Sequence, residues 1–134
     1  EYYGQEFKNM AWLDLTMSQR TRPEGYDSTV LVDVDGHVTE GPGFNVGIVK
    51  DGTIYTADKN VLKGITMKVV EAMATEHNIP FVRKPITVEE YNSADEVFIA
   101  SSSGGVTATT NTGPITEILM NEYIVKKEEY ATEL

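Results

Sequence analysis

Hydrophobic residues along the first half of the chain follow the pattern of β-strands interrupted by Asp-Gly pairs. A β-branched run over residues 28–40 is broken at Asp35-Gly36, and a second run over residues 44–56 is broken at Asp51-Gly52. Asp-Gly between two apolar runs is a strong signal for a tight turn, because this pair accepts the positive φ angles that such turns need. The pattern therefore predicts two β-hairpins.

Apolar residues also recur at helical spacing. Met10, Leu13 and Met17 predict a helix over residues 9–20. The segment 64–80 predicts the clearest helix, which Asn78 and Pro80 end. Its expected apolar stripe contains Ile65, Val69 and Met73 and, less strictly, Val70 and Ala74.

The second half of the chain predicts shorter elements and a last helix. Residues 81–86 and 95–100 predict strands, and Thr87 with Glu90 three residues later is a capping box that opens a short helix. The final helix begins at Pro114 and carries on one face Ile115, Ile118, Leu119 and Tyr123. Strands and helices are mixed, with hairpins in place of regular βαβ units, which indicates a mixed α/β domain.

Composition narrows the functional classes. The 134 residues carry a formal net charge of −10, two histidines and no cysteine. Without cysteine, disulfides, iron–sulfur clusters and thiolate zinc sites are excluded. The acidic balance argues against a nucleic-acid partner, because binding to phosphates needs a basic face. The chain shows neither a signal peptide nor the roughly 20 apolar residues of a membrane span, so we expect a single cytoplasmic domain.

Asp33, Asp35 and His37 alternate along one predicted strand and raise the question of a metal. A calcium loop needs a glycine and later acids at positions where this sequence lacks them. One histidine with two turn acids is also a poor set of ligands for zinc. We therefore expect no metal site.

Four other segments contain residue types that carry chemistry. Lys8 precedes the first predicted helix, and Glu40 precedes a Gly-Pro-Gly turn. Gly64 precedes a helix whose first turn offers free N–H groups and the Thr66 hydroxyl to an anion such as phosphate. A loop of serines and glycines begins at Ser101. Each feature alone also fits an ordinary explanation: a surface lysine, a turn acceptor, a helix start and a flexible loop.

In their order along the chain, these segments resemble the class IV, or fold-type IV, pyridoxal-phosphate aminotransferases. That group includes branched-chain, D-amino-acid and (R)-selective amine transaminases. The motifs that carry the resemblance are VTEGPGFN from residue 38, DGTIYT from 51, LKGIT from 62, ADEVF from 94 and GPIT from 113. The resemblance covers about residues 8–123. It implies the large C-terminal domain of this fold type, a pseudo-barrel of mixed strands flanked by helices.

The resemblance implies two catalytic residues. Lys8 matches the lysine that holds the cofactor aldehyde as a Schiff base. Glu40 matches the acid that keeps the pyridine nitrogen protonated, and Asn45 would orient this acid.

The resemblance also implies contacts to the rest of the cofactor and to the substrate. Leu62 would press on one face of the pyridine ring. The phosphate would be held by Ile65, Thr66 and Ser102, and Gly64 and Ser101 would also bind the cofactor. Ser103 and Gly104 match the loop that borders the substrate pocket.

The sequence departs from the resembled family in two places. Family members carry a hairpin before GPIT, where residues 109–112 of this chain make a direct connection. They also carry a small N-terminal domain before the lysine, which supplies a phosphate-binding arginine. We therefore expect residues 1–134 to be the cofactor-binding large domain without the small domain.

The activity implied by the resemblance is amino transfer between an amine or amino acid and a keto acid, with pyridoxal 5′-phosphate as cofactor and a homodimer as the assembly. The GFN that ends the first motif and the double glycine of SSSGG resemble the (R)-selective amine group. Branched-chain or D-amino-acid transamination and aminodeoxychorismate-lyase chemistry are alternatives within the family. A non-catalytic fragment or assembly domain is the alternative of a different class.

Overall fold

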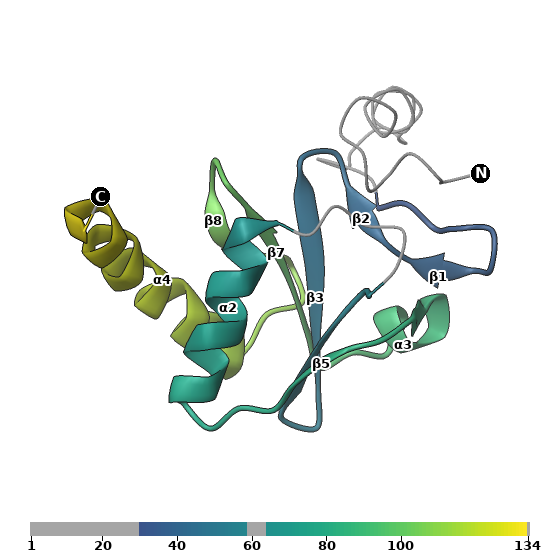
Figure 1. Cartoon of the computed structure of the whole chain (residues 1–134). Helices are drawn as coiled ribbons and strands as arrows, with labels where there is room; N and C mark the ends of the chain where they lie inside the picture. The colour runs from purple at the N-terminus through teal and green to yellow at the C-terminus, as the bar shows by residue number, and fades with distance from the viewer. Residues whose placement is uncertain (1–29, 59–63, 134) are drawn as a thin grey trace.

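The computed structural model of the chain describes residues 30–58 and 64–133 (Figure 1). The helix predicted over residues 9–20 lies outside these residues. Within them, strands and helices are mixed along the chain, as the sequence predicts. None of the helices in the described ranges is both long and apolar enough to cross a membrane.

A six-stranded sheet forms the centre of the fold. Its strands are β2 (Glu40–Gly41), β3 (Phe44–Lys50), β4 (Thr53–Thr56), β5 (Phe81–Arg83), β7 (Glu96–Ser101) and β8 (Gly105–Ala108). The order is β5-β4-β3-β7-β8, and β2 pairs with the start of β3. Only β4 and β5 pair in parallel within this sheet, and α2 (Ile65–Glu76) connects them along the chain. The described fold thus contains one βαβ unit beside the hairpins that the sequence predicts.

The two predicted hairpin turns are confirmed, but the strand pairing beside them differs. Asp51 and Gly52 join β3 to β4 with φ angles of 50° and 78°, as a tight hairpin requires. At the first turn, Gly36 has a φ of 81°, but the arm before it makes only one isolated bridge, from Val32 to Val38. The strand after it, β1 (His37–Val38), pairs with β6 (Ile86–Thr87). β1 therefore has a neighbour on each edge, the arm before the turn on one side and β6 on the other.

Helices α2 and α4 (Pro114–Glu133) lie next to each other on one side of the sheet (Figure 1). The main core fills the space between these helices and the sheet, and its buried residues are Val49, Ile54, Met67, Val70, Met73, Ala74, Phe98, Ala100, Val106 and Leu119. A smaller cluster packs on β1, β6 and α3 (Val88–Asn92), and its buried residues are Val38, Val46, Ile48, Ile86, Ala94 and Val97. The sheet is therefore apolar on both faces.

The buried face of α2 differs from the predicted stripe. Met73, Val70 and Ala74 are buried as predicted, but Ile65 is 79% exposed, so its assignment to the core is wrong. Thr66 is buried in its place. Its hydroxyl donates a hydrogen bond to the protein, so burial of this polar group is compensated. The buried face of α2 therefore begins at Thr66 and not at Ile65.

The last helix shows a smaller difference. Leu119 is fully buried, and Ile115 and Tyr123 pack against the main core, as the sequence predicts. Ile118 is 38% exposed and does not belong to the buried face. The residues of α4 that contact the core, Ile115, Leu119 and Tyr123, are spaced by four positions. Ile118 lies at the edge of this row.

The predicted capping box at the start of α3 is confirmed. The Thr87 hydroxyl accepts from Glu90 N at 3.0 Å, and the Glu90 carboxylate accepts from Thr87 N at 3.0 Å. The same carboxylate forms an ion pair with Lys84. The pKa of Glu90 is lowered, first by the hydrogen bond from Lys84 and then by that from Thr87.

A buried carboxylate on β7 holds the start of α4. Glu96 is 5% exposed and accepts from Thr116 N at 2.7 Å and from Ile115 N at 3.3 Å. These amides belong to the first helical turn, which has no intrahelical partner for them. A Cβ at Gly113 would lie 2.8 Å from the Glu96 side chain, so the glycine makes room for this clamp. Residues 109–112 thus lead through Gly113 into α4, whose first turn is fixed to β7 by Glu96.

We predict that Glu96→Ala lowers the free energy of unfolding by about 2 kcal/mol, because two helix amides lose a charged acceptor. Urea denaturation measures this loss. Glu117→Ala is the matched control, since Glu117 is an exposed acid in the first turn of the same helix. Its removal should cost no more than about 0.5 kcal/mol. Equal losses in the two variants would contradict the clamp.

Candidate active site

The predicted site residues that the structure describes come together at one end of the central sheet. The start of β3, the end of β7 and the start of α2 meet there, at the upper end of the sheet in Figure 1. The register pairs Glu40 with Asn45 across β2 and β3, and Asn45 with Ala100 across β3 and β7. Directly opposed residues share one face of a sheet. Alternation along β3 places that face on the side of Val49, which packs with α2.

Glu40 is a buried acid at this end. Only 3% of the Glu40 surface is exposed to solvent. Burial of a carboxylate is costly unless hydrogen bonds or a cation stabilise it. Glu40 is therefore not a solvent-exposed acid.

The glycines after Glu40 have local structural reasons. Gly43 has a φ of 80° and follows Pro42, the arrangement of a type II turn. Gly41 faces the ring of Phe44, which would lie 2.1 Å from a Cβ at that position. The turn and the aromatic ring thus explain both glycines.

The start of α2 presents backbone amides without a side-chain cap. Gly64 is the N-cap residue, makes no side-chain cap hydrogen bond, and is followed by a first turn without acidic residues. The amides of a first turn have no intrahelical acceptor, and the helix dipole favours a negative charge near them. This end of α2 is chemically suited to an anion.

The Thr66 hydroxyl has a role that the sequence did not reveal. It donates to the backbone carbonyl of Ser101 at 3.0 Å and thereby ties α2 to the end of β7. A hydroxyl has a single hydrogen to donate. In this arrangement the hydroxyl hydrogen is not available to a phosphate, so the predicted phosphate contact of Thr66 stays a prediction.

The serine–glycine loop is a tight turn between β7 and β8. The Ser101 hydroxyl accepts from Gly104 N at 3.0 Å, which closes the turn. Ser102, Ser103 and Gly104 are exposed at its surface. The loop is therefore shaped by its own hydrogen bond, and its exposed residues directly follow Ser101.

A further contact was missed from the sequence. The Asn45 side chain lies against Gly64, and a Cβ at that glycine would be 2.5 Å from Asn45 Oδ1. The two residues are 19 positions apart, and no motif spacing signals this contact. Asn45 thus joins β3 to the start of α2.

Two of the predicted site residues, Lys8 and Leu62, lie outside the described residues. The structure brings together Glu40, Asn45, Gly64, Thr66 and Ser101, while Ile65 and the loop residues 102–104 lie exposed beside them.

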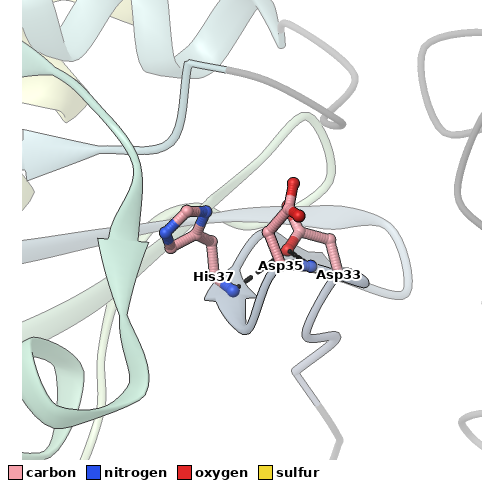
Figure 2. A group of neighbouring side chains, drawn as sticks. All are labelled: Asp33, Asp35 and His37. Carbon is pink, nitrogen blue, oxygen red and sulfur yellow. Dashed lines mark hydrogen bonds between the residues drawn. The ribbon is translucent and has the colours of Figure 1, made fainter.

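Asp33, Asp35 and His37 also lie close together, with their ligand atoms within 4.8 Å of one another. Figure 2 shows that Asp33 holds the turn: its Oδ1 accepts from Asp35 N at 2.9 Å and from His37 N at 3.0 Å. These hydrogen bonds are typical of an Asx turn, which brings side chains together without a metal. The absence of a metal site stays a prediction.

Comparison with known proteins gives one family. The family described as Amino-transferase class IV matches residues 2–111. A branched-chain-amino-acid aminotransferase of Pseudomonas aeruginosa is 36% identical over 110 residues, covering 74% of this chain and 36% of the relative. A D-alanine aminotransferase of Staphylococcus haemolyticus is 39% identical over 102 residues, covering 65% of this chain and 36% of the relative. The chain thus spans about a third of the length of these curated relatives.

Solved structures agree with this family. A branched-chain aminotransferase of the thermophilic archaeon Thermoproteus uzoniensis, with norvaline, matches at a TM-score of 0.80 and 31% identity, covering 85% of this chain and 42% of that chain. A second branched-chain amino acid aminotransferase, solved with pyridoxamine 5′-phosphate, matches at a TM-score of 0.80 and 26% identity, covering 85% of this chain and 42% of that chain. The expected fold, mixed strands with flanking helices, is confirmed.

We predict that Thr66→Val lowers the free energy of unfolding by about 1–2 kcal/mol, because the Ser101 carbonyl loses its donor. Thr66→Ser keeps the hydroxyl and should lose clearly less. Urea denaturation of the protein without added ligand measures both values. If serine and valine cost the same, the hydrogen bond is not what fixes the start of α2.

Proposed function

The chain belongs to the class IV aminotransferase family, and from this premise we infer that it forms the cofactor-binding part of a pyridoxal-phosphate-dependent transaminase. One observation carries the inference. The strand register and the Asn45–Gly64 contact put a buried acid and an uncapped helix start at the same end of one sheet. Those are the two groups that the nitrogen and the phosphate of this cofactor require.

The described residues fit the cofactor chemically. Glu40 supplies an anionic acceptor that is buried, and α2 supplies amides without a side-chain cap. When bound, pyridoxal phosphate supplies a ring that accepts electrons from the substrate carbon. The protein's contribution is to bind the group, orient it and hold its proton.

Glu40 would hold a proton on the pyridine nitrogen. Charge–charge interactions are stronger in a site of low dielectric, so a buried carboxylate stabilises that proton better than an exposed one. Asn45 stands opposite Glu40 on the neighbouring strand, in position to restrict the orientation of the acid. Burial of Glu40 supports this role.

The start of α2 would bind the phosphate. The amides of Ile65 and Thr66 lie in its first turn, where the helix dipole adds to their hydrogen bonds. The Thr66–Ser101 hydrogen bond keeps these amides in place relative to β7. Ser102, exposed in the adjoining turn, would add a hydroxyl.

We assign the remaining roles by resemblance to the family. Lys8 would hold the cofactor covalently and move the proton between substrate and cofactor. Leu62 would contact the ring, and Ser103 and Gly104 would border the substrate. A homodimer, a small N-terminal domain and a cytoplasmic location belong to the same proposal.

Two classes of amino donor remain in competition. The GFN segment and the double glycine of the loop favour an (R)-selective amine donor. The matched relatives carry the names of branched-chain and D-alanine aminotransferases, which favours an amino acid donor. A panel of (R)-amines, branched-chain L-amino acids and D-alanine, each with a keto acid acceptor, separates these classes.

We predict that pyridoxal phosphate binds covalently to Lys8. Borohydride reduction of the loaded protein, followed by peptide mapping, should place the label on this residue. Lys8→Ala should abolish the absorbance band of the bound cofactor, while Lys50→Ala is the matched control. Label on Lys50, Lys63 or Lys68 would exclude the assignment.

We predict that Glu40→Gln retains the bound cofactor but loses most turnover. A neutral amide no longer holds the pyridine proton, and this should raise the barrier by several kcal/mol, on the order of 10³-fold or more in kcat. Steady-state kinetics of the variant measures the effect. Asp35→Asn is the control, because Asp35 is an exposed acid of the preceding turn. An unchanged kcat in Glu40→Gln would reduce Glu40 to a structural residue.

A further inference from the structure

The helix start at Gly64 contains a glycine that its backbone does not require. Gly64 has a φ of −75° and a ψ of 148°, an extended conformation that any L-residue adopts. Serine, threonine or aspartate at this N-cap position would add a stabilising side-chain cap. The surroundings of Gly64 give a reason for a glycine at this position.

A side chain at position 64 would have to displace the side-chain amide of Asn45. A Cβ built there would lie 2.5 Å from Asn45 Oδ1 and 3.7 Å from Asn45 Cγ. Among the described residues outside its own neighbours, no other atom comes within 4 Å of that point. Real Cβ atoms essentially never approach a heavy atom as closely as 2.5 Å. The glycine is thus matched to one side chain.

Asn45 also lies next to the buried acid. It is paired with Glu40 on one neighbouring strand and with Ala100 on the other, and the three side chains share the face that α2 covers. Asn45 is therefore a direct neighbour of Glu40 in the sheet and also contacts the start of α2. On the β7 side, the helix start is fixed by the hydrogen bond from Thr66 to Ser101.

We propose that Asn45 is a positioning residue that sets the separation between Glu40 and the start of α2, and that position 64 is glycine in order to receive its side chain. The consequence rests on the function proposed above. A rigid cofactor held by its ring nitrogen at one end and by its phosphate at the other fits only one separation. Small displacements of either anchor weaken binding at both ends.

A double-mutant cycle tests the proposal. The variants are Gly64→Ala, Asn45→Ala and the double variant, and alanine adds a Cβ without adding a cap. Thermal unfolding is measured without cofactor, and affinity is measured with pyridoxal 5′-phosphate by absorbance titration. The Cβ of Asn45 is not among the atoms within 4 Å of the built Cβ, so the double variant has room for both methyl groups.

We expect Gly64→Ala alone to lower the melting temperature by about 5 °C and to weaken pyridoxal phosphate binding by about tenfold, as contacting residues couple. In the Asn45→Ala background the same change should cost little in either measurement. Asn45→Ala alone should weaken pyridoxal phosphate binding. Asn45→Asp keeps an oxygen at the position of Asn45 Oδ1. In that background Gly64→Ala should therefore still lower both the melting temperature and the affinity for pyridoxal phosphate.

Additive effects in the cycle would overturn the proposal, and so would wild-type affinity for pyridoxal phosphate in Asn45→Ala. A failure of the proposed function has a different signature. In that case the wild-type protein would not bind pyridoxal phosphate, while cofactor-free unfolding would still report the coupling between positions 45 and 64. The contact would then stand without the positioning role.

Discussion

Backbone pairing along β3 is the constraint on which the rest of the structure depends. This strand pairs with β2 at its start, with β4 at its end and with β7 along most of its length. Because side chains alternate across a sheet, a slip of one residue in the ladder with β2 or β7 would put Glu40 or Ala100 on the face opposite to Asn45. Both faces of the sheet are apolar, so burial strongly favours the observed register.

Three side-chain contacts to helix starts accompany that register, and two of them belong to the candidate site. Asn45 lies against Gly64, Thr66 bonds to the Ser101 carbonyl, and Glu96 holds the first turn of α4. Each contact joins a strand to the N-terminal end of a helix, where backbone amides need partners. The sheet thus fixes the helix starts directly, and one of them is left with a glycine cap that suits a bound anion.

Much of this arrangement could be predicted from the sequence, because local rules govern it. Asp51-Gly52 specifies its own turn, and Thr87 and Glu90 specify their own cap. The assignment of Ile65 to the core failed because tertiary contacts decide how a helix is rotated, and the hydroxyl of Thr66 drew the other side of the first turn inward. The Asn45–Gly64 contact was not predictable, since it joins segments whose distance depends on the whole sheet. The roles of the site residues were given by family resemblance and not by these rules.

The hydrogen bond from Thr66 to Ser101 spans 35 residues of sequence. Contacts of this kind cost loop-closure entropy and form only after the chain segments between them have been organised. The site therefore cannot assemble from a local hairpin or from α2 alone, and β3 and β7 must pair before the helix start has a surface to meet. A ligand that recognises the finished site selects the fully folded chain over every partly folded form, and its concentration becomes a determinant of how much folded protein is present.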